Sequence, residues 1–185
     1  MQTNNRKAVN NVKLFGSTKV LVISALLIAM SIVLGKLLAF NIGSSIRISF
    51  ENLPLLMAGI FFGPFIGAAV GAGADLIGCM IVGYSINPII TLGAASIGFT
   101  AGAVSKLLAD KGVLPRTFFS AAAGHAVGSM LIKSLGLLIY FHTPVQVLLM
   151  RIPLYTGIAV LESYIIYMLL KNKEFSSQLE RICKK

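Results

Sequence analysis

Long runs of apolar residues, separated by short stretches rich in glycine, proline or charge, dominate this sequence and restrict what it can fold into. An α-helix rises about 1.5 Å per residue, so about 20 apolar residues cross the roughly 30 Å hydrocarbon core of a bilayer. The runs predict helices at Thr18–Phe40, Ser45–Phe62, Pro64–Gly83, Pro88–Ala109, Thr117–Phe141 and Gln146–Leu170. We therefore expect an all-α membrane protein, built as a bundle of six transmembrane helices.

The balance of residue types excludes a soluble globular domain. Of the 185 residues, 56% are hydrophobic and 12% are charged, which leaves too few polar side chains to cover a globule of this size. The second predicted helix is the weakest span, because its cleanly apolar part, Leu53–Phe62, covers only about 15 Å. We expect this helix to be short, tilted or partly re-entrant.

Basic residues predict how the bundle is oriented. The formal net charge is +10, but the basic side chains gather at the chain ends and at one connection, a pattern typical of membrane orientation rather than of nucleic-acid binding. The three groups are Arg6, Lys7, Lys13 and Lys19; Lys106, Lys111 and Arg116; and Lys171, Lys173, Arg181, Lys184 and Lys185. In a six-span bundle they lie on one side, so the positive-inside rule places both termini in the cytoplasm. The predicted organisation is a cytoplasmic tail over residues 1–17, a transmembrane domain over 18–170 and a cytoplasmic tail over 171–185.

Small residues recur four apart on several of the predicted helices. They are Ala25 and Ala29; Gly63, Gly67 and Gly71; Ala94, Gly98 and Gly102; and Gly124 and Gly128. Such faces let helix backbones approach closely in lipid. We expect most of them to pack within the bundle, whereas the face on the first helix could instead dock another protein.

Charged residues inside apolar runs are candidates for function, because a charge costs roughly 2.5–3.5 kcal/mol at the bilayer centre unless it meets a partner or a ligand. Asp75, Lys133 and Arg151 are about 7–12 Å below the outer ends of their helices, so they could converge on one external cavity. Two cations and a carboxylate suit a ligand with an anionic end and a heterocycle that donates hydrogen bonds. The alternative is an internal ion pair of Asp75 with Lys133 or Arg151 that only holds helices together.

Further polar and aromatic residues lie on these helices or near their ends. Tyr84, Asn87 and Phe141 are near the outer ends, where they could stack on and hydrogen-bond a ligand or lie at the membrane interface. His125 and Glu162 lie at similar depth to each other and predict a separate, deeper contact with a structural role.

Motifs for catalysis, cofactors and metals are missing from the sequence. It contains no G-x-x-x-x-G-K-[ST] phosphate loop, so the chain would not power transport with ATP by itself. It also lacks H-E-x-x-H, G-x-S-x-G and an acidic metal cluster. We therefore predict that the chain is not an enzyme and holds no cofactor or metal.

Three motifs carry a resemblance to a known family. They are RISFENLP at residues 47–54, GIFFGP at 59–64 and GADLIG at 73–78. With the Ala25 and Ala29 element and the Asn87-Pro88 start of the fourth helix, they resemble the substrate-binding S components of energy-coupling factor (ECF) transporters, closest to the folate family. The similarity extends over the whole six-helix chain. It is less specific for the vitamin, because related S components with similar motifs take different substrates.

The resemblance implies a multi-pass subunit of a bacterial plasma membrane, whose transmembrane domain binds folate or a related vitamin from outside. It also implies that this subunit associates with a shared transmembrane coupling protein and, through it, with two ATPase subunits. The Ala25 and Ala29 face would contact the coupling protein, and the S component would tip in the membrane to release its load inward.

For a folate-like ligand we expect Asp75 to accept the N–H donors of the pterin, and Lys133 and Arg151 to face the glutamate carboxylates. Tyr84 and Asn87 are further candidate binding residues. Arg47 could gate the cavity or pair with Glu51 four residues later on a helical start.

Two other kinds of function stay open. The chain could be an S component for another vitamin, such as pantothenate or riboflavin. It could also be a proton-coupled secondary transporter that uses Asp75, His125 and Glu162 as a relay, although no repeated halves of the kind found in many such carriers are seen. A membrane enzyme is the weakest alternative.

Overall fold

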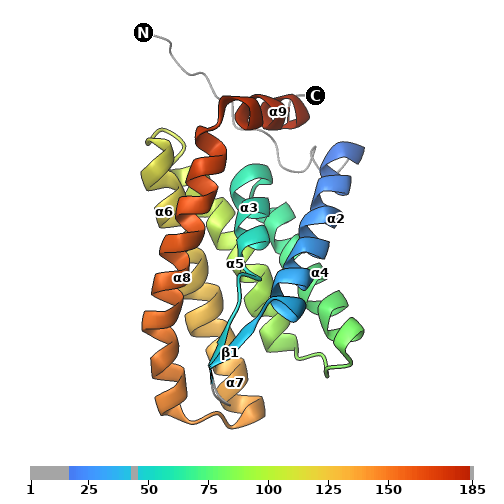
Figure 1. Cartoon of the computed structure of the whole chain (residues 1–185), viewed down its shortest axis with the longest axis vertical. Coiled ribbons are helices and arrows are strands. Elements are labelled where there is room, and N and C mark those ends of the chain that lie inside the picture. Colours follow the sequence, from blue (N-terminus) through green and yellow to red (C-terminus); the bar gives the residue numbers. More distant parts are fainter. Residues whose placement is uncertain (1–16, 43–45, 184–185) are drawn as a thin grey trace.

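Helices make up nearly all of the chain in the computed structural model, which describes residues 17–42 and 46–183. The helices are α2 (Thr18–Ile32), α3 (Leu53–Phe62), α4 (Pro64–Val82), α5 (Pro88–Leu107), α6 (Val113–Gly124), α7 (Lys133–Phe141), α8 (Val145–Lys171) and α9 (Lys173–Cys183). Two π-helical segments, η1 (Val33–Leu37) and η2 (His125–Ile132), continue α2 and join α6 to α7. Two short strands, β1 (Phe40–Ile42) and β2 (Ile46–Ile48), form the remaining regular elements (Figure 1).

Five helical stretches among the described residues are long and apolar enough to cross a membrane. They are Thr18–Lys36, Pro64–Val82, Pro88–Leu107, Val113–Phe141 and Val145–Lys171. Each corresponds to a run predicted from the sequence, with ends that differ by a few residues. The chain is therefore a multi-pass membrane protein. The sixth apolar helix, α3, has only 10 residues, which rise about 15 Å.

The structure corrects the second predicted helix, Ser45–Phe62, and the end of the first, Thr18–Phe40. The first helical stretch ends at Leu37, and Phe40 begins an antiparallel hairpin in which Phe40 pairs with Ile48. Ser45 lies outside the described residues. Helix α3 begins only at Leu53, because Pro54 fits the first turn of a helix, where no N–H is required. The β-branched Ile46 and Ile48 favour the strand that precedes it.

The short helix α3 lies in the middle of the bundle and supplies much of its core. Leu55, Leu56, Ala58, Ile60 and Phe62 are almost completely buried. They pack against the neighbouring helices α2, α4 and α5. Because α3 is shorter than the bilayer and enclosed by longer helices, it needs no lipid-facing surface.

Glycines let α4 and α5 touch along their backbones, as the small-residue faces predicted. A Cβ built at Gly98 would lie 2.8 Å from Gly67 Cα and closer still to the Gly67 carbonyl. Gly71 meets the main chain of Ala94 in the same way. The packing within the bundle that we expected for these residues is confirmed, since only hydrogen fits where the two main chains meet.

Polar and apolar side chains are distributed as a lipid environment requires. Large apolar side chains on the spans face outward, among them Leu26, Phe65, Met80, Leu92 and Leu149. Polar side chains that are buried include Ser31, Asn52, Ser105, Ser120, His125, Ser129, Lys133 and Glu162. The outside of the bundle therefore matches the acyl chains, and polar groups concentrate inside it.

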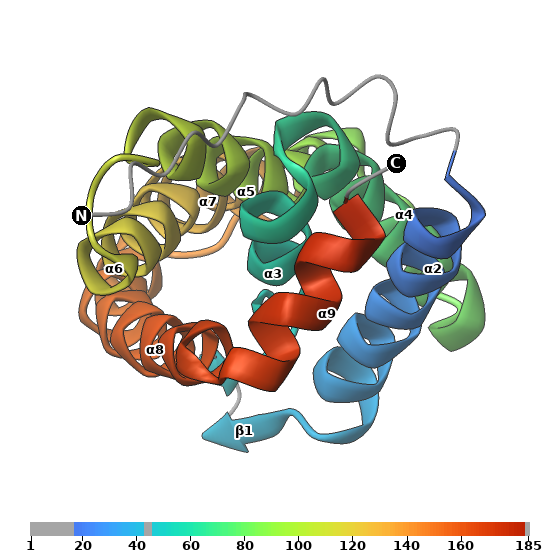
Figure 2. The same cartoon turned by 90° about the horizontal axis from the view of Figure 1, so that it is seen from above.

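The C-terminal segment forms helix α9, which lies across one end of the bundle (Figures 1 and 2). Its partly buried face carries Leu179 and Ile182, which pack on the cluster around Val20 and Phe62. Phe175 contacts Phe61 of α3 with ring centroids 5.6 Å apart. The predicted tail over 171–185 thus contains an amphipathic helix docked on the bundle.

Candidate functional site

A hollow opens between the helices on the side of α3 that is remote from α9. About 310 Å³ of space not filled by atoms, including the open mouth, belongs to it. Its wall is formed by Ser31, Ile32, Lys36, Glu51, Asn52, Leu55, Gly71, Ala74, Asp75, Ala94 and Lys133. These residues come from six elements or their flanks, so the hollow depends on the whole bundle being assembled.

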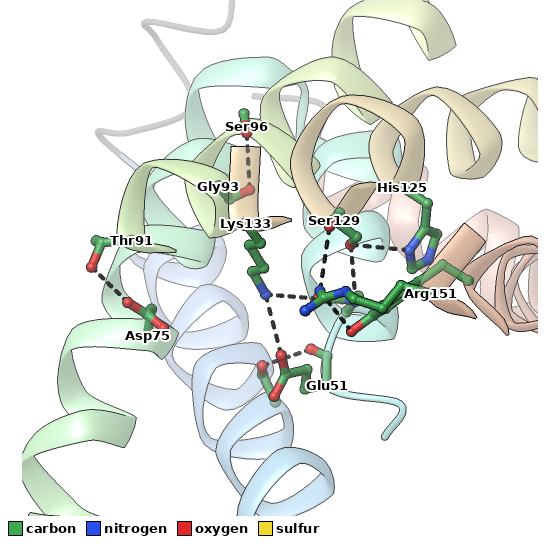
Figure 3. Close-up of polar contacts among 12 residues, drawn as sticks. Glu51, Asp75, Thr91, Gly93, Ser96, His125, Ser129, Lys133 and Arg151 are labelled. Carbon is green, nitrogen blue, oxygen red and sulfur yellow. Dashed lines mark hydrogen bonds and ion pairs between the residues drawn. The ribbon is translucent and has the colours of Figure 1, made fainter. Parts of the chain in front are cut away.

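Lys133 is the buried cation of this site. Only 8% of its surface is exposed, and its Nζ donates to Glu51 Oε1 at 3.2 Å and to Asn52 Oδ1 at 3.4 Å (Figure 3). Gly93 of α5 leaves the room that the lysine stem occupies, because a Cβ there would lie 2.6 Å from Lys133 Cγ. The side chain is thus held with its ammonium group at the wall of the hollow.

Glu51 and Asn52 stand immediately before α3. The Ser31 hydroxyl of α2 donates to the main-chain oxygen of Glu51 at 2.7 Å, and the glutamate side chain lies against Gly35 of η1, where a Cβ would be 2.8 Å from Oε2. Asn52 is 1% exposed. The RISFENLP motif therefore delivers a carboxylate and an amide to the hollow.

Asp75 lies on another part of the wall and is not paired with Lys133 or Arg151. Its Oδ2 accepts a hydrogen bond from the Thr91 hydroxyl at 2.6 Å (Figure 3). The sequence had left open an ion pair of Asp75 with Lys133 or Arg151. Among these three described residues, no such pair forms. Lys36 lines the same hollow, and its Nζ lies 5.2 Å from the centre of the Tyr84 ring.

Arg151 lies behind the wall rather than on it. Its Nη2 donates to the main-chain oxygen of Ser129 and to the hydroxyl of Tyr155, both at 3.4 Å. Its guanidinium carbon is 5.0 Å from the centre of the Tyr155 ring, and its Nε has no partner in the structure. The structure thus brings Asp75 and Lys133 to one hollow, whereas Arg151 is not among the residues that form its wall.

A chain of hydrogen bonds leads from the hollow into the middle of the bundle. Asn52 Nδ2 donates to Ser129 Oγ at 3.4 Å, and Ser129 Oγ lies 3.2 Å from His125 Nδ1. His125 Nε2 is 2.6 Å from Glu162 Oε2, and both of these side chains are fully buried. This confirms the deep contact predicted between His125 and Glu162.

One π-helical segment contributes a residue to the wall of the hollow, and the other ends directly before a wall residue. Segment η1 carries Lys36, and η2 carries His125 and Ser129 and ends directly before Lys133. A π-turn is wider than an α-turn and changes the direction in which the following side chains point, which explains why such turns are frequent at functional sites. Sequence periodicity does not predict either π-helical segment.

The other predicted site residues are placed differently. Tyr84 is 56% exposed and borders the site only through Lys36. Asn87 caps α5, because its Oδ1 accepts from the main-chain N–H groups of Ile89 and Ile90. Arg47 stands on strand β2 opposite Asn41 and not on a helical start. Its side chain lies outside the described residues.

Sequence reasoning missed several wall residues, chiefly Lys36, Glu51, Asn52 and Ser31. Lys36 is the one charge near the end of the first long apolar run after Lys19, and Glu51 and Asn52 stand in a motif that we used for the family resemblance. These signals could have been read as site residues. Ser31 carries no such signal, because serine is common in membrane helices.

A second depression, lined almost entirely by apolar side chains, lies between α2 and α4. Its wall is formed by Val20, Leu21, Ser24, Ala25, Ile28, Ile66, Ala69 and Val70. Ala25 and Ala29 are both exposed on α2, so their small-residue face is not used for packing within the bundle. We call the eight residues of this wall the α2–α4 groove.

Comparison with known protein families identifies the family of this chain. A family model described as "ECF transporter, substrate-specific component" matches residues 19–173, which is most of the chain. The chain belongs to this family. The ECF resemblance seen in the sequence is thereby confirmed, and the protein is a substrate-binding subunit of a transporter rather than an enzyme.

Solved structures of S components share the fold. A FolT crystal structure with bound folic acid has a TM-score of 0.64 and 21% identity, and the match covers 82% of this chain and 92% of that one. An S component for biotin has a TM-score of 0.64 and 22% identity, covering 90% and 96%. The S component of a bacterial ECF transporter has a TM-score of 0.62 and 22% identity, covering 90% and 98%. No curated protein matches. At these identities the likeness concerns the fold alone.

Proposed function

We propose that this S component captures a vitamin from outside a bacterial cell, and that the vitamin is folate. The observation that carries the proposal is the hollow, which places the buried Lys133 and the carboxylate of Asp75 on one wall without pairing them. A cation attracts the carboxylates of the glutamate end, and a carboxylate accepts paired N–H donors of a pterin.

The size of the hollow bears on how such a ligand would lie. The unfilled space of about 310 Å³ includes the open mouth, so the enclosed part of the hollow is smaller than this value. A molecule as long as folate would therefore extend from the hollow through its mouth. Arg151 is not part of the wall of the hollow, whereas Lys133 is, so we expect Lys133 to contribute more than Arg151.

The arrangement of basic residues supports our proposal for the orientation in the membrane. The start of α2, the connection from α5 to α6 and the end of α8 lie at the same end of the bundle as α9 (Figure 1). This end carries Lys19, Lys106, Lys111, Arg116 and Lys171. The positive-inside rule favours a cytoplasmic location for it, with both termini inside and the hollow open to the outside. In this arrangement α3 is a sixth, incomplete crossing enclosed by the other five.

We further propose that the exposed face of Ala25 and Ala29 on α2 binds the transmembrane coupling protein of the ECF module. Through this protein the S component would associate with two ATPase subunits. Support comes from the exposure of both alanines and from the α2–α4 groove beside them. Small side chains allow another helix to approach closely. Substitution of both alanines by leucine should abolish capture of the coupling protein while folate binding stays unchanged.

Binding of folate to the purified protein tests the proposal directly. We expect binding without ATP or a proton gradient, and a pterin absorbance spectrum in protein extracted from its native membrane. Asp75→Asn and Lys133→Gln should each weaken folate binding by tenfold or more, about 1.4 kcal/mol. Lys111→Gln removes an exposed charge at the opposite end of the bundle and is the matched control. Affinities of both site variants within about threefold of the wild type, roughly 0.65 kcal/mol, would contradict the proposal.

A proton-coupled secondary transporter is the second candidate, because His125 and Glu162 form a buried pair of titratable groups. The hydrogen-bonded chain from this pair leads to Asn52 and Lys133 and not to Asp75, whose bonded partner is Thr91. Among the described residues, no hydrogen bond therefore connects Asp75 to the other two residues of the supposed relay, His125 and Glu162. Folate uptake into liposomes by this chain without partners, driven by a pH gradient, would favour the carrier.

A further inference from the structure

We propose that Lys36 is a ligand-binding residue, and that its ammonium group, at the mouth of the hollow, holds the outer carboxylate of the vitamin. This inference rests on the proposed function and deepens it, because it assigns a second cation to the anionic end of the ligand. For folate, Lys133 binds the inner α-carboxylate of the glutamate end and Lys36 binds the terminal γ-carboxylate. Neither the family resemblance nor the shared fold supplies this role for Lys36.

The first step concerns the charges on the wall of the hollow, where Lys36 and Lys133 are the two cations. Lys133 pairs with Glu51 at 3.2 Å, and Asp75 accepts a hydrogen bond from Thr91. Among the described residues, no carboxylate forms a salt bridge with Lys36. An anionic group of a ligand can therefore bind Lys36 without displacing a carboxylate of the protein.

The second step concerns the group that Lys36 contacts, which is an aromatic ring. Its Nζ lies 5.2 Å from the centre of the Tyr84 ring, within the range at which a ring face attracts a cation. The ring is uncharged, so it orients the ammonium group and leaves its charge unneutralised. Tyr84 thus holds Lys36 at the wall and keeps it ready for an anion.

The third step concerns the position of Lys36 along the path of the ligand. A Cβ at Gly78 of α4 would lie 3.3 Å from Lys36 Cε, so the lysine stem lies against this glycine. Gly78 follows Asp75 by three residues, which places it on the same side of α4 and about 4.5 Å further along the helix. Helix α4 runs away from the α9 end of the bundle (Figure 1). The outer part of a ligand anchored at Asp75 therefore lies beside Lys36.

The alternative role for Lys36 is contact with lipid. Lysines near the ends of membrane helices often extend their ammonium groups to the headgroups. Lys36 is partly buried instead, and its stem follows the wall between η1 and α4. An ammonium group beside a protein wall attracts an anion more strongly than one surrounded by water, because fewer water molecules screen the charge. This placement favours the ligand over the lipid as its partner.

Calorimetric titration with folate and with pteroylglutamine, in which an amide replaces the γ-carboxylate, tests this role. Wild type should bind folate about tenfold more tightly than pteroylglutamine, equal to about 1.4 kcal/mol. Lys36→Gln should weaken folate binding about tenfold and reduce this preference to less than twofold, because it has no charge that distinguishes acid from amide. Its unchanged affinity for pteroylglutamine would show that the site is intact. Lys36→Arg keeps the charge and should keep most of the preference, and Lys36→Met serves if the glutamine variant does not fold.

Lys171→Gln is the matched control. Lys171 also lies over a tyrosine ring, with its Nζ 5.6 Å from the centre of the Tyr167 ring, but it ends α8 beside α9. This variant should keep the tenfold preference for folate. A tenfold preference that persisted in Lys36→Gln would overturn the inference and make Lys36 an interfacial residue. Wild-type protein that bound folate and pteroylglutamine equally would overturn it as well.

Failure of the folate assignment would give a different result. Wild-type protein that bound biotin or pantothenate in place of folate would contradict that assignment alone. The same comparison would then use the vitamin and its amide, and Lys36→Gln should again lose the preference for the carboxylate form. A wild type that bound only an uncharged vitamin would overturn both the folate assignment and the role of Lys36.

Discussion

Two glycines in the same protein predict opposite effects of one substitution. Gly98 of α5 faces the main chain of α4, and a Cβ there would lie 2.8 Å from Gly67 Cα and closer to its carbonyl. Gly157 of α8 has nothing within 4 Å of the position that a Cβ would occupy. Both residues are in helix interiors, so the intrinsic preference for alanine over glycine acts equally on them.

The expected magnitudes follow from these surroundings. Alanine stabilises a helix interior by roughly 0.5–1 kcal/mol relative to glycine. Gly157→Ala should therefore raise the free energy of unfolding by up to that amount. In Gly98→Ala the methyl group must push two backbones apart, and overpacking of a tight core typically costs about 1–3 kcal/mol. Because backbone atoms, and not a flexible side chain, stand in the way, we expect a net loss near the upper value.

Thermal unfolding of the two variants in the same detergent checks the prediction. With roughly 2–4 °C per kcal/mol for a chain of this size, Gly98→Ala should melt several degrees below wild type and Gly157→Ala at or slightly above it. Equal melting temperatures for the two variants would refute the reasoning, because they would mean that α4 and α5 separate without cost. A further variant, Gly67→Ala, approaches the same contact from the other helix and should behave like Gly98→Ala.

Two other predictions concern single elements. Asn87→Ala should lower the free energy of unfolding by about 1 kcal/mol through the loss of a helix N-cap, while folate affinity, measured by calorimetry, changes less than threefold; a tenfold loss would instead make Asn87 a ligand contact. Ile182→Asp should release α9 from the bundle, seen as faster protease cleavage after Lys171, whereas Ser177→Asp on the exposed face of the same helix should not; equal cleavage would show that α9 does not depend on its apolar face.

The sequence was sufficient to predict the five long membrane-spanning stretches, because length and apolarity alone identify them. It was insufficient for the hairpin of β1 and β2, because each strand has only three residues, too few for periodicity to distinguish helix from strand. The start of α3 at Leu53 could have been inferred from Pro54, whose ring is best accommodated in a first helical turn.

The candidate site was predicted in part. Depth along a helix correctly brought Asp75 and Lys133 to one hollow, because that estimate needs only the helical rise. It could not show that Arg151 is turned toward Tyr155 and Ser129, since depth contains no information on the direction of a side chain. The pairing of Lys133 with Glu51 joins residues 82 positions apart, and only the assembled bundle reveals it.

The shortness of α3 has a consequence for how cargo leaves the protein. Its first turn borders the hollow, and Phe61 near its last turn contacts α9, so about 15 Å of densely packed helix separates a captured molecule from the far end. A tunnel through this obstruction would require α3 to part from α4 and α5, where glycine backbones are already in contact. Movement of the entire subunit within the bilayer keeps those backbones in contact. The packing around α3 therefore favours rigid-body movement of the subunit over separation of its helices.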